Sequence, residues 1–139
     1  MNVKYLDVWS QIRKLTSTVK RELDLALMPA DLRVFEFQIM NCIRENGPST
    51  MSNISHALTV SRTGTAMLVE GVEAKGFVRR RKSDTDRRVV FVSLTPKGLK
   101  KLDEALDLQQ ALAKKKLECL SDSELNELNV LLGRLLESA

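Results

Sequence analysis

Apolar side chains recur at steps of three or four residues through most of this chain, which is the pattern of amphipathic helices. The first stripe stops before Pro29 and consists of Leu6, Trp9, Ile12, Leu15, Val19, Leu23 and Leu27. A second helix is expected to begin near Asp31 and to stop at Asn46-Gly47-Pro48, because Gly and Pro interrupt helices. Its apolar positions are Leu32, Phe35, Ile39, Cys42 and Ile43.

A short helix, a tight turn and a second helix are predicted next, which is the pattern of a helix-turn-helix. The short helix is expected to begin near Ser49 or Thr50. The second has Ser61 as its N-cap and Gly76 at its carboxyl end, where glycine favours a C-terminal cap. Its buried side is expected to consist of Thr65, Leu68, Val69 and Val72. The opposite, exposed side is then Arg62, Thr63, Ala66, Met67 and Glu70.

A basic β-hairpin follows the second helix. The segment Arg79 to Arg88 reads RRRKSDTDRR, and the next ten residues, VVFVSLTPKG, are rich in β-branched side chains. Alternate residues of a strand face opposite ways, so the three consecutive arginines that begin at Arg79 cannot all point at one ligand. At least one of them is expected to have a structural role.

Two further helices complete the chain. Thr95 can cap the first of them, with Pro96 in its opening turn, and the residues Ser121 to Glu124 form a capping box that starts the last. The residues of the last helix that are expected to face inward are Leu125, Leu128, Leu132 and Leu135. The predicted fold class is mainly α with a small β-hairpin, a winged helix-turn-helix flanked by N- and C-terminal helices.

The leucine-rich stripes of the first and last helices are longer than a domain of 139 residues can cover alone. Burial against a second copy of the chain is the simplest remedy, and a two-fold dimer is the commonest closed assembly. We therefore expect a homodimer in which the terminal helices form the interface.

The net charge of +4 is unevenly distributed along the chain. Lys75 to Lys101 contains ten Lys or Arg and two Asp, a local charge of +8, which leaves −4 for the remainder. A basic segment is often only a solvated surface, but this one lies on a hairpin directly after a helix-turn-helix. The expected ligand is double-stranded DNA.

Other classes of protein are disfavoured by the composition. No apolar run approaches the roughly 18 residues that cross a bilayer, and Lys4, Asp7 and Arg13 interrupt any signal peptide, so a cytoplasmic protein without a membrane partner is expected. The sequence contains no cofactor loop, metal cluster or nucleophile-base set, so we expect neither an enzyme nor a cofactor or metal. Cys42 and Cys119 are too few and too far apart in sequence for a disulfide scaffold, and Cys42 is expected to be a small hydrophobic residue of the core, with oxidant sensing by either thiol as the alternative.

Two segments resemble the MarR family (multiple-antibiotic-resistance regulators) of dimeric winged-helix transcription factors. They are VSRTGTAMLVEGVEAKGFVRR, residues 60–80, and DTDRRVVFVSLTPKG, residues 84–98. The second matches the family's wing pattern of Asp, two residues, Arg, a short strand and Leu-Thr-x-x-Gly. The resemblance implies a single MarR-like domain over residues 1–139. Its DNA-binding lobe would be residues 30–98, and its dimerisation helices would be 1–28 and 96–139.

The resemblance also implies the residues that touch DNA. The family's minor-groove arginine falls on Arg88, with Asp86 as the acidic neighbour that shapes the wing tip and with Arg87 and Lys82 near phosphates. Ser61 would begin the recognition helix, whose N-terminus can bind a phosphate. The positions matching major-groove contacts are Arg62, Thr63, Ala66 and Met67. The resemblance also allows a small-molecule effector between the dimer helices and the DNA-binding lobe.

The expected function is a transcriptional regulator, in the first place a repressor, that binds a palindromic operator as a homodimer. Met67 cannot donate a hydrogen bond to a base, although it can touch a thymine methyl group, so the wing and the DNA shape are expected to contribute much of the specificity. The alternative is an architectural or non-sequence-specific DNA-binding protein with the same charge distribution. A protein-binding winged helix is a more distant third.

Overall fold

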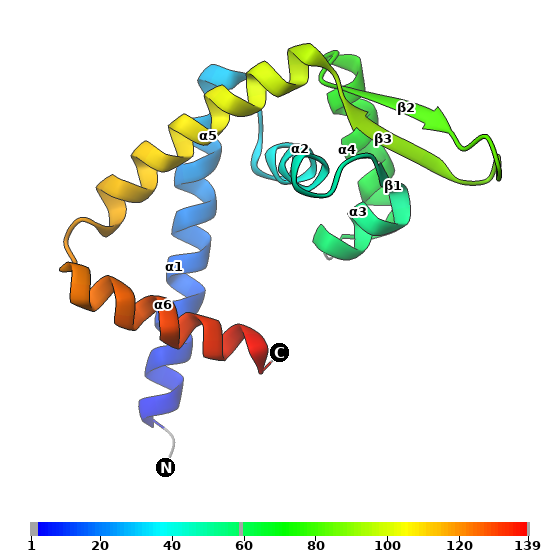
Figure 1. The fold of residues 1–139 in the computed structure, drawn as a ribbon. Coiled ribbons are helices and arrows are strands. Elements are labelled where there is room, and N and C mark those ends of the chain that lie inside the picture. Colours follow the sequence, from blue (N-terminus) through cyan, green and yellow to red (C-terminus); the bar gives the residue numbers. More distant parts are fainter. Residues whose placement is uncertain (1–2, 59, 139) are drawn as a thin grey trace.

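The computed structural model describes residues 3–58 and 60–138. Its helices are α1 (Val3–Leu27), the short 3-10 helix η1 (Met28–Ala30), α2 (Val34–Asn46), α3 (Met51–Leu58), α4 (Arg62–Ala74), α5 (Pro96–Leu117) and α6 (Asp122–Glu137). Its strands are β1 (Ser49–Thr50), β2 (Val78–Lys82) and β3 (Val90–Leu94). Helices α2, α3 and α4 and the sheet form a lobe at one end, from which α1 and α5 extend together (Figure 1). The predicted fold class, a winged helix-turn-helix, is confirmed.

The start of α2 differs from the prediction, because Asp31 precedes the helix by three residues. Asp31 has a left-handed backbone with φ of 57° and closes η1 through its N–H to the Met28 carbonyl. The first free N–H groups of α2 are satisfied by other carboxylates. Asp24 of α1 accepts the N–H of Val34 at 2.9 Å, and Glu36 accepts that of Arg33 at 2.9 Å. The contact from Asp24 ties the lobe to α1.

The strand β1 also differs from the prediction. Ser49 and Thr50 pair with Val92 and Phe91 of β3 instead of opening a helix, so the expected hairpin is part of a three-stranded antiparallel sheet in the order β1-β3-β2. The hydroxyl of Thr50 still caps α3 by accepting the N–H of Asn53 at 3.1 Å.

Helix α4 has the expected caps. The Ser61 hydroxyl accepts the N–H of Gly64 at 3.0 Å. At the other end Gly76 has φ of +80°, and the N–H of Phe77 reaches the Val72 carbonyl at 3.0 Å, which is a Schellman motif. Its inward face packs into the hydrophobic core, to which α1 and α5 also contribute. The largest fully buried side chains are Leu27, Ile39, Met40, Ile54, Thr65, Val69, Val72, Phe77, Val92 and Leu102.

Gly71 lies within α4, where it lowers helix stability relative to alanine. A Cβ at this position would lie 3.7 Å from Oε2 of Glu36, an ordinary van der Waals contact. We therefore expect Gly71→Ala to raise the free energy of unfolding by up to about 1 kcal/mol. Urea unfolding followed by circular dichroism measures this change, and a loss of stability would mean that α4 and α2 are packed more tightly than described.

Helix α6 begins at the predicted capping box, in which Ser121 and Glu124 exchange hydrogen bonds, and these bonds lower the pKa of the Glu124 carboxyl. Its leucines do not face inward as predicted, because no described residue of α6 is buried within the single chain. The amino-terminal half of α1 is equally uncovered, with exposed Leu6, Trp9 and Leu15. None of the helices in the described ranges is long and apolar enough to cross a membrane.

Candidate nucleic-acid interface

The amino-terminal half of α4 exposes one continuous face. Arg62, Thr63 and Met67 are exposed and Ala66 is half-buried, whereas Thr65 on the opposite side is fully buried. The exposed fraction of Met67 is 69%, which is high for a large apolar side chain and leaves it available to a ligand. The guanidinium of Arg62 donates to the hydroxyl of Ser52 in α3. The sequence-predicted helix residues thus share a face, with Arg62 turned towards α3.

The tip of the hairpin between β2 and β3, which we call the wing, is a compact loop. The N–H of Ser83 donates to the Val89 carbonyl at 2.9 Å and extends the ladder beyond the Lys82–Val90 pair. The hydroxyl of Ser83 accepts the N–H groups of Thr85 and Asp86 at 3.2 and 3.3 Å. The loop is therefore held by its own backbone and side chains.

Arg88 projects from this loop and is oriented by Asp86. The Asp86 carboxylate accepts the Arg88 backbone N–H at 3.0 Å, Nε at 3.1 Å and Nη2 at 3.3 Å. The side-chain and backbone hydrogen bonds from Arg88 lower the pKa of Asp86, so this carboxylate is charged at neutral pH. The Arg88 side chain is nevertheless 91% exposed. The wing therefore presents an oriented guanidinium to solvent.

The three consecutive arginines of β2 divide as the alternation of a strand predicts. Arg80 turns towards α4, where Nη2 lies 2.8 Å from Oε1 of Glu73 and the Arg80 N–H reaches Oε2 at 3.1 Å. This confirms that one of the three is structural. The same contacts raise the pKa of Arg80 and lower that of Glu73 below its ordinary value of 4.5. The pair's contribution to stability is present above pH 4.5 and is lost as the pH falls through the lowered pKa.

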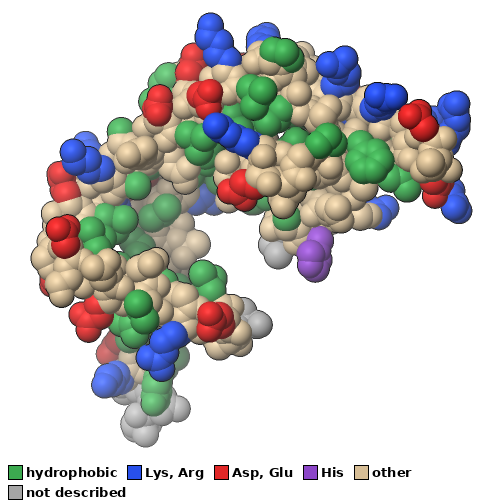
Figure 2. Space-filling view, in the orientation of Figure 1, with side chains coloured by type: hydrophobic (Ala, Val, Ile, Leu, Met, Phe, Trp, Pro, Cys, Tyr) green, Lys and Arg blue, Asp and Glu red, His purple; other side chains and the backbone are tan. Residues whose placement is uncertain are grey.

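Basic side chains gather around the wing in the space-filling view (Figure 2). Lys82 and Arg87 are both exposed there, close in sequence to Arg88. Two residues of this region, Ser52 and Glu73, orient an arginine each and are not predicted from the sequence. Nothing in the local pattern marks them, since Ser52 lies ten residues from Arg62 and Glu73 seven from Arg80.

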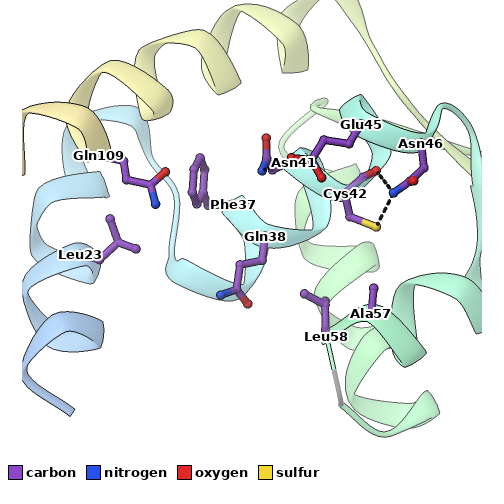
Figure 3. A pocket seen from close by; sticks show the side chains of 10 residues that line it. All are labelled: Leu23, Phe37, Gln38, Asn41, Cys42, Glu45, Asn46, Ala57, Leu58 and Gln109. Carbon is purple, nitrogen blue, oxygen red and sulfur yellow. Dashed lines mark hydrogen bonds between the residues drawn. The ribbon is translucent and has the colours of Figure 1, made fainter. Parts of the chain in front are cut away.

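A hollow lies between the lobe and the long helices (Figure 3). Leu23 of α1 and Gln109 of α5 face α2 across it, and Leu58 of α3 lies near Cys42 on the far side. Its volume is about 460 Å³, and its other lining residues are Phe37, Gln38, Asn41, Glu45, Asn46 and Ala57. Cys42 accepts a hydrogen bond from Asn46 at 3.6 Å, and both cysteines are free thiols.

A helix-turn-helix with an exposed second helix beside a basic wing defines a winged-helix transcriptional regulator. Comparison with known proteins agrees with this class. A sequence model of the MarR family matches residues 34–90. The chain is similar to the transcriptional regulator BldR from Sulfolobus solfataricus, with 30% identity, a TM-score of 0.81 and coverage of 94% of this chain and 96% of BldR. The chain belongs to the MarR family and is a transcriptional regulator rather than an enzyme.

Two further similarities are informative. The transcriptional repressor MprA of Escherichia coli K12 is 34% identical over 93 residues, which cover 67% of this chain but only 53% of MprA. A point mutant of E. coli MarR, solved in complex with operator DNA, has the same fold, with a TM-score of 0.86, 24% identity and coverage of 96% of both chains.

Proposed function

We propose that this chain is a homodimeric repressor that binds a palindromic operator, with α4 in a major groove and the wing in the adjacent minor groove of each half-site. The observation that carries this proposal is the exposed guanidinium of Arg88, held at a slim loop by Asp86. A narrow minor groove concentrates negative potential, and a planar guanidinium on a thin hairpin can enter it. Lys82 and Arg87 are then near phosphates.

The exposed face of α4 supports the major-groove half of the proposal. Ser61 starts the helix, so free N–H groups at this end can bind a phosphate. Arg62 and Thr63 offer hydrogen-bond donors to base edges, and Ala66 and Met67 offer apolar contact to thymine methyl groups. Because half of these positions read only methyl groups, DNA shape and the wing supply a large share of the specificity.

The uncovered apolar surfaces of α1 and α6 support a dimer. Trp9 and Leu135 are among their large exposed side chains, and a second copy of the chain buries them. In this arrangement residues 1–28 and 96–139 are the dimerisation helices and 30–98 form the DNA-binding lobe. Half-site centres then lie about one helical turn, some 34–36 Å, apart on the operator.

Repression and an effector complete the proposal. The likeness to the repressor MprA supports a repressor rather than an activator. The hollow between α1, α2, α3 and α5 supports a small-molecule effector, because a ligand there touches both the lobe and the long helices and can change their spacing.

A mobility-shift titration tests this function, with the DNA upstream of the protein's own gene compared with random duplex at several salt concentrations. We expect a strong preference for the upstream DNA and a log-log salt slope of about −0.9 per phosphate neutralised. Equal affinity for the two duplexes would instead support an architectural protein. Sedimentation of the free protein should give a dimer, and a monomer at the same concentration contradicts the two-fold arrangement.

A further inference from the structure

A partly buried charge cluster fixes the carboxyl end of α4. Nζ of Lys75 donates to Oε1 of Glu36 at 3.0 Å and to the carbonyl oxygen of Asp31 at 2.7 Å, and it lies 3.7 Å from the Asp31 carboxylate. Glu36 is only 8% exposed, and the same Oε1 accepts the N–H of Arg33. We call Lys75, Glu36 and Asp31 the Lys75 anchor.

The anchor joins three separate parts of the fold. Lys75 ends α4, Glu36 lies in the first turn of α2, and Asp31 follows η1, where α1 has just ended. The other half of α4 is fixed differently, through a buried hydrogen bond of 2.9 Å between the hydroxyls of Thr65 and Ser55 of α3. Together with the Arg62–Ser52 and Glu73–Arg80 contacts, these two polar contacts hold the direction of the helix within the lobe.

The direction of α4 matters because its DNA-facing residues lie around Thr65, in the half that the Ser55 hydrogen bond holds, while loss of the anchor loosens the opposite end. A helix is close to a rigid rod, so a tilt of roughly 10° about Thr65 turns every side chain of the exposed face by the same angle. Contacts to base edges depend on the direction of each donor, and such a rotation weakens them.

We propose that Lys75 and Glu36 are positioning residues for sequence recognition, which hold α4 at the angle that matches a major groove. This inference rests on the proposed function. Lys75 acts through α4 and not through a phosphate of its own. Its ammonium group is already bound by Asp31 and Glu36, and its side chain is 28% exposed, at the end of α4 farthest from Ser61.

The test uses the full chain and the ratio of affinities for upstream DNA and random duplex. Loss of stability alone lowers the amount of folded protein for both duplexes and leaves that ratio unchanged. We expect Lys75→Met to lower the ratio roughly tenfold, the discrimination of about one base contact, without changing the salt slope. Lys75→Arg keeps the positive charge and the hydrogen-bond donors, so its affinity ratio should be close to that of the wild-type protein.

Lys116→Met is the matched control. Lys116 has a comparable, 35% exposed side chain and pairs with a carboxylate, Glu22, at 3.0 Å, but it lies in α5, outside the basic segment. This variant should keep the wild-type ratio. Glu36→Gln removes the charge while preserving the shape, so it keeps the test valid if Lys75→Met folds poorly, and it should also lower the ratio.

Three results would overturn the inference. An unchanged ratio in folded Lys75→Met and Glu36→Gln proteins shows that the anchor does not set recognition, although the proposed function stands. If Lys75→Met loses affinity equally for both duplexes, and its salt slope is smaller by about 0.9, Lys75 contacts a phosphate instead. If the wild-type protein itself shows no preference for the upstream DNA, the proposed function fails and this inference fails with it.

Discussion

Replacing Arg88 with alanine should weaken binding to the upstream DNA roughly 10- to 100-fold, the usual range for losing hydrogen bonds to a charged group. The thermal unfolding midpoint should stay close to that of the wild-type protein. The side chain is 91% exposed, and its partner Asp86 lies on the same loop, so Arg88 does not hold the core. Fluorescence anisotropy with labelled duplex measures the affinity, and circular dichroism checks the fold.

Two variants separate position from charge. Lys115→Ala removes one positive charge from an exposed site on α5, far along the helix from the wing, and should change affinity little. Arg88→Lys keeps the charge but not the planar fork, so its affinity should lie between those of the wild type and the alanine variant. If Arg88→Ala binds the upstream DNA as tightly as the wild type at each salt concentration, the wing does not enter a groove.

Among the six glycines of the chain, Gly98 should be the one whose replacement with alanine destabilises the protein most. A Cβ at Gly98 would lie 1.9 Å from the carbonyl oxygen and 2.8 Å from the carbonyl carbon of Phe77. These are backbone atoms at the junction of β2 and α5, which Thr95 also closes by donating to the Gly76 carbonyl at 2.6 Å. The free energy of unfolding should fall by about 3 kcal/mol, at the upper end of the cost of overpacking.

Gly133→Ala is the control for Gly98→Ala, because it adds the same methyl group within α6, where a Cβ meets nothing within 4 Å. It should leave stability unchanged or raise it slightly, since alanine favours helix over glycine. Chemical unfolding of the two variants provides the comparison. Similar unfolding midpoints for both would mean that α5 and β2 do not approach as closely as described.

Local signals explain how much of the fold is predictable. The cap at Ser61, the stop at Gly76 and the capping box at Ser121 each depend on a few neighbouring residues, and the structure has all three. The prediction for the start of α2 is wrong because its caps include Asp24, ten residues earlier in the chain. Strand β1 is not predicted, because two residues are too few to show an alternation of apolar and polar positions. Only their pairing with β3 makes them a strand.

The candidate site also contains residues that the sequence predicts and residues that only the fold reveals. Its exposed helix face and its wing follow from periodicity and charge, whereas Glu73 and Glu36 act on partners that only the fold brings near. Leu132 and Leu135 illustrate a third case. Their apolar stripe is evident in the sequence, but it does not face inward, because the single chain offers no surface that covers it.

Hydroxyl-radical footprinting of the upstream DNA shows whether two copies of α4 and the wing occupy neighbouring grooves of one duplex. We expect two protected half-sites related by two-fold symmetry, with centres about 34–36 Å apart, and minor-groove protection that disappears in the Arg88→Ala protein. A single unsymmetrical footprint, or uniform protection along the duplex, would contradict it.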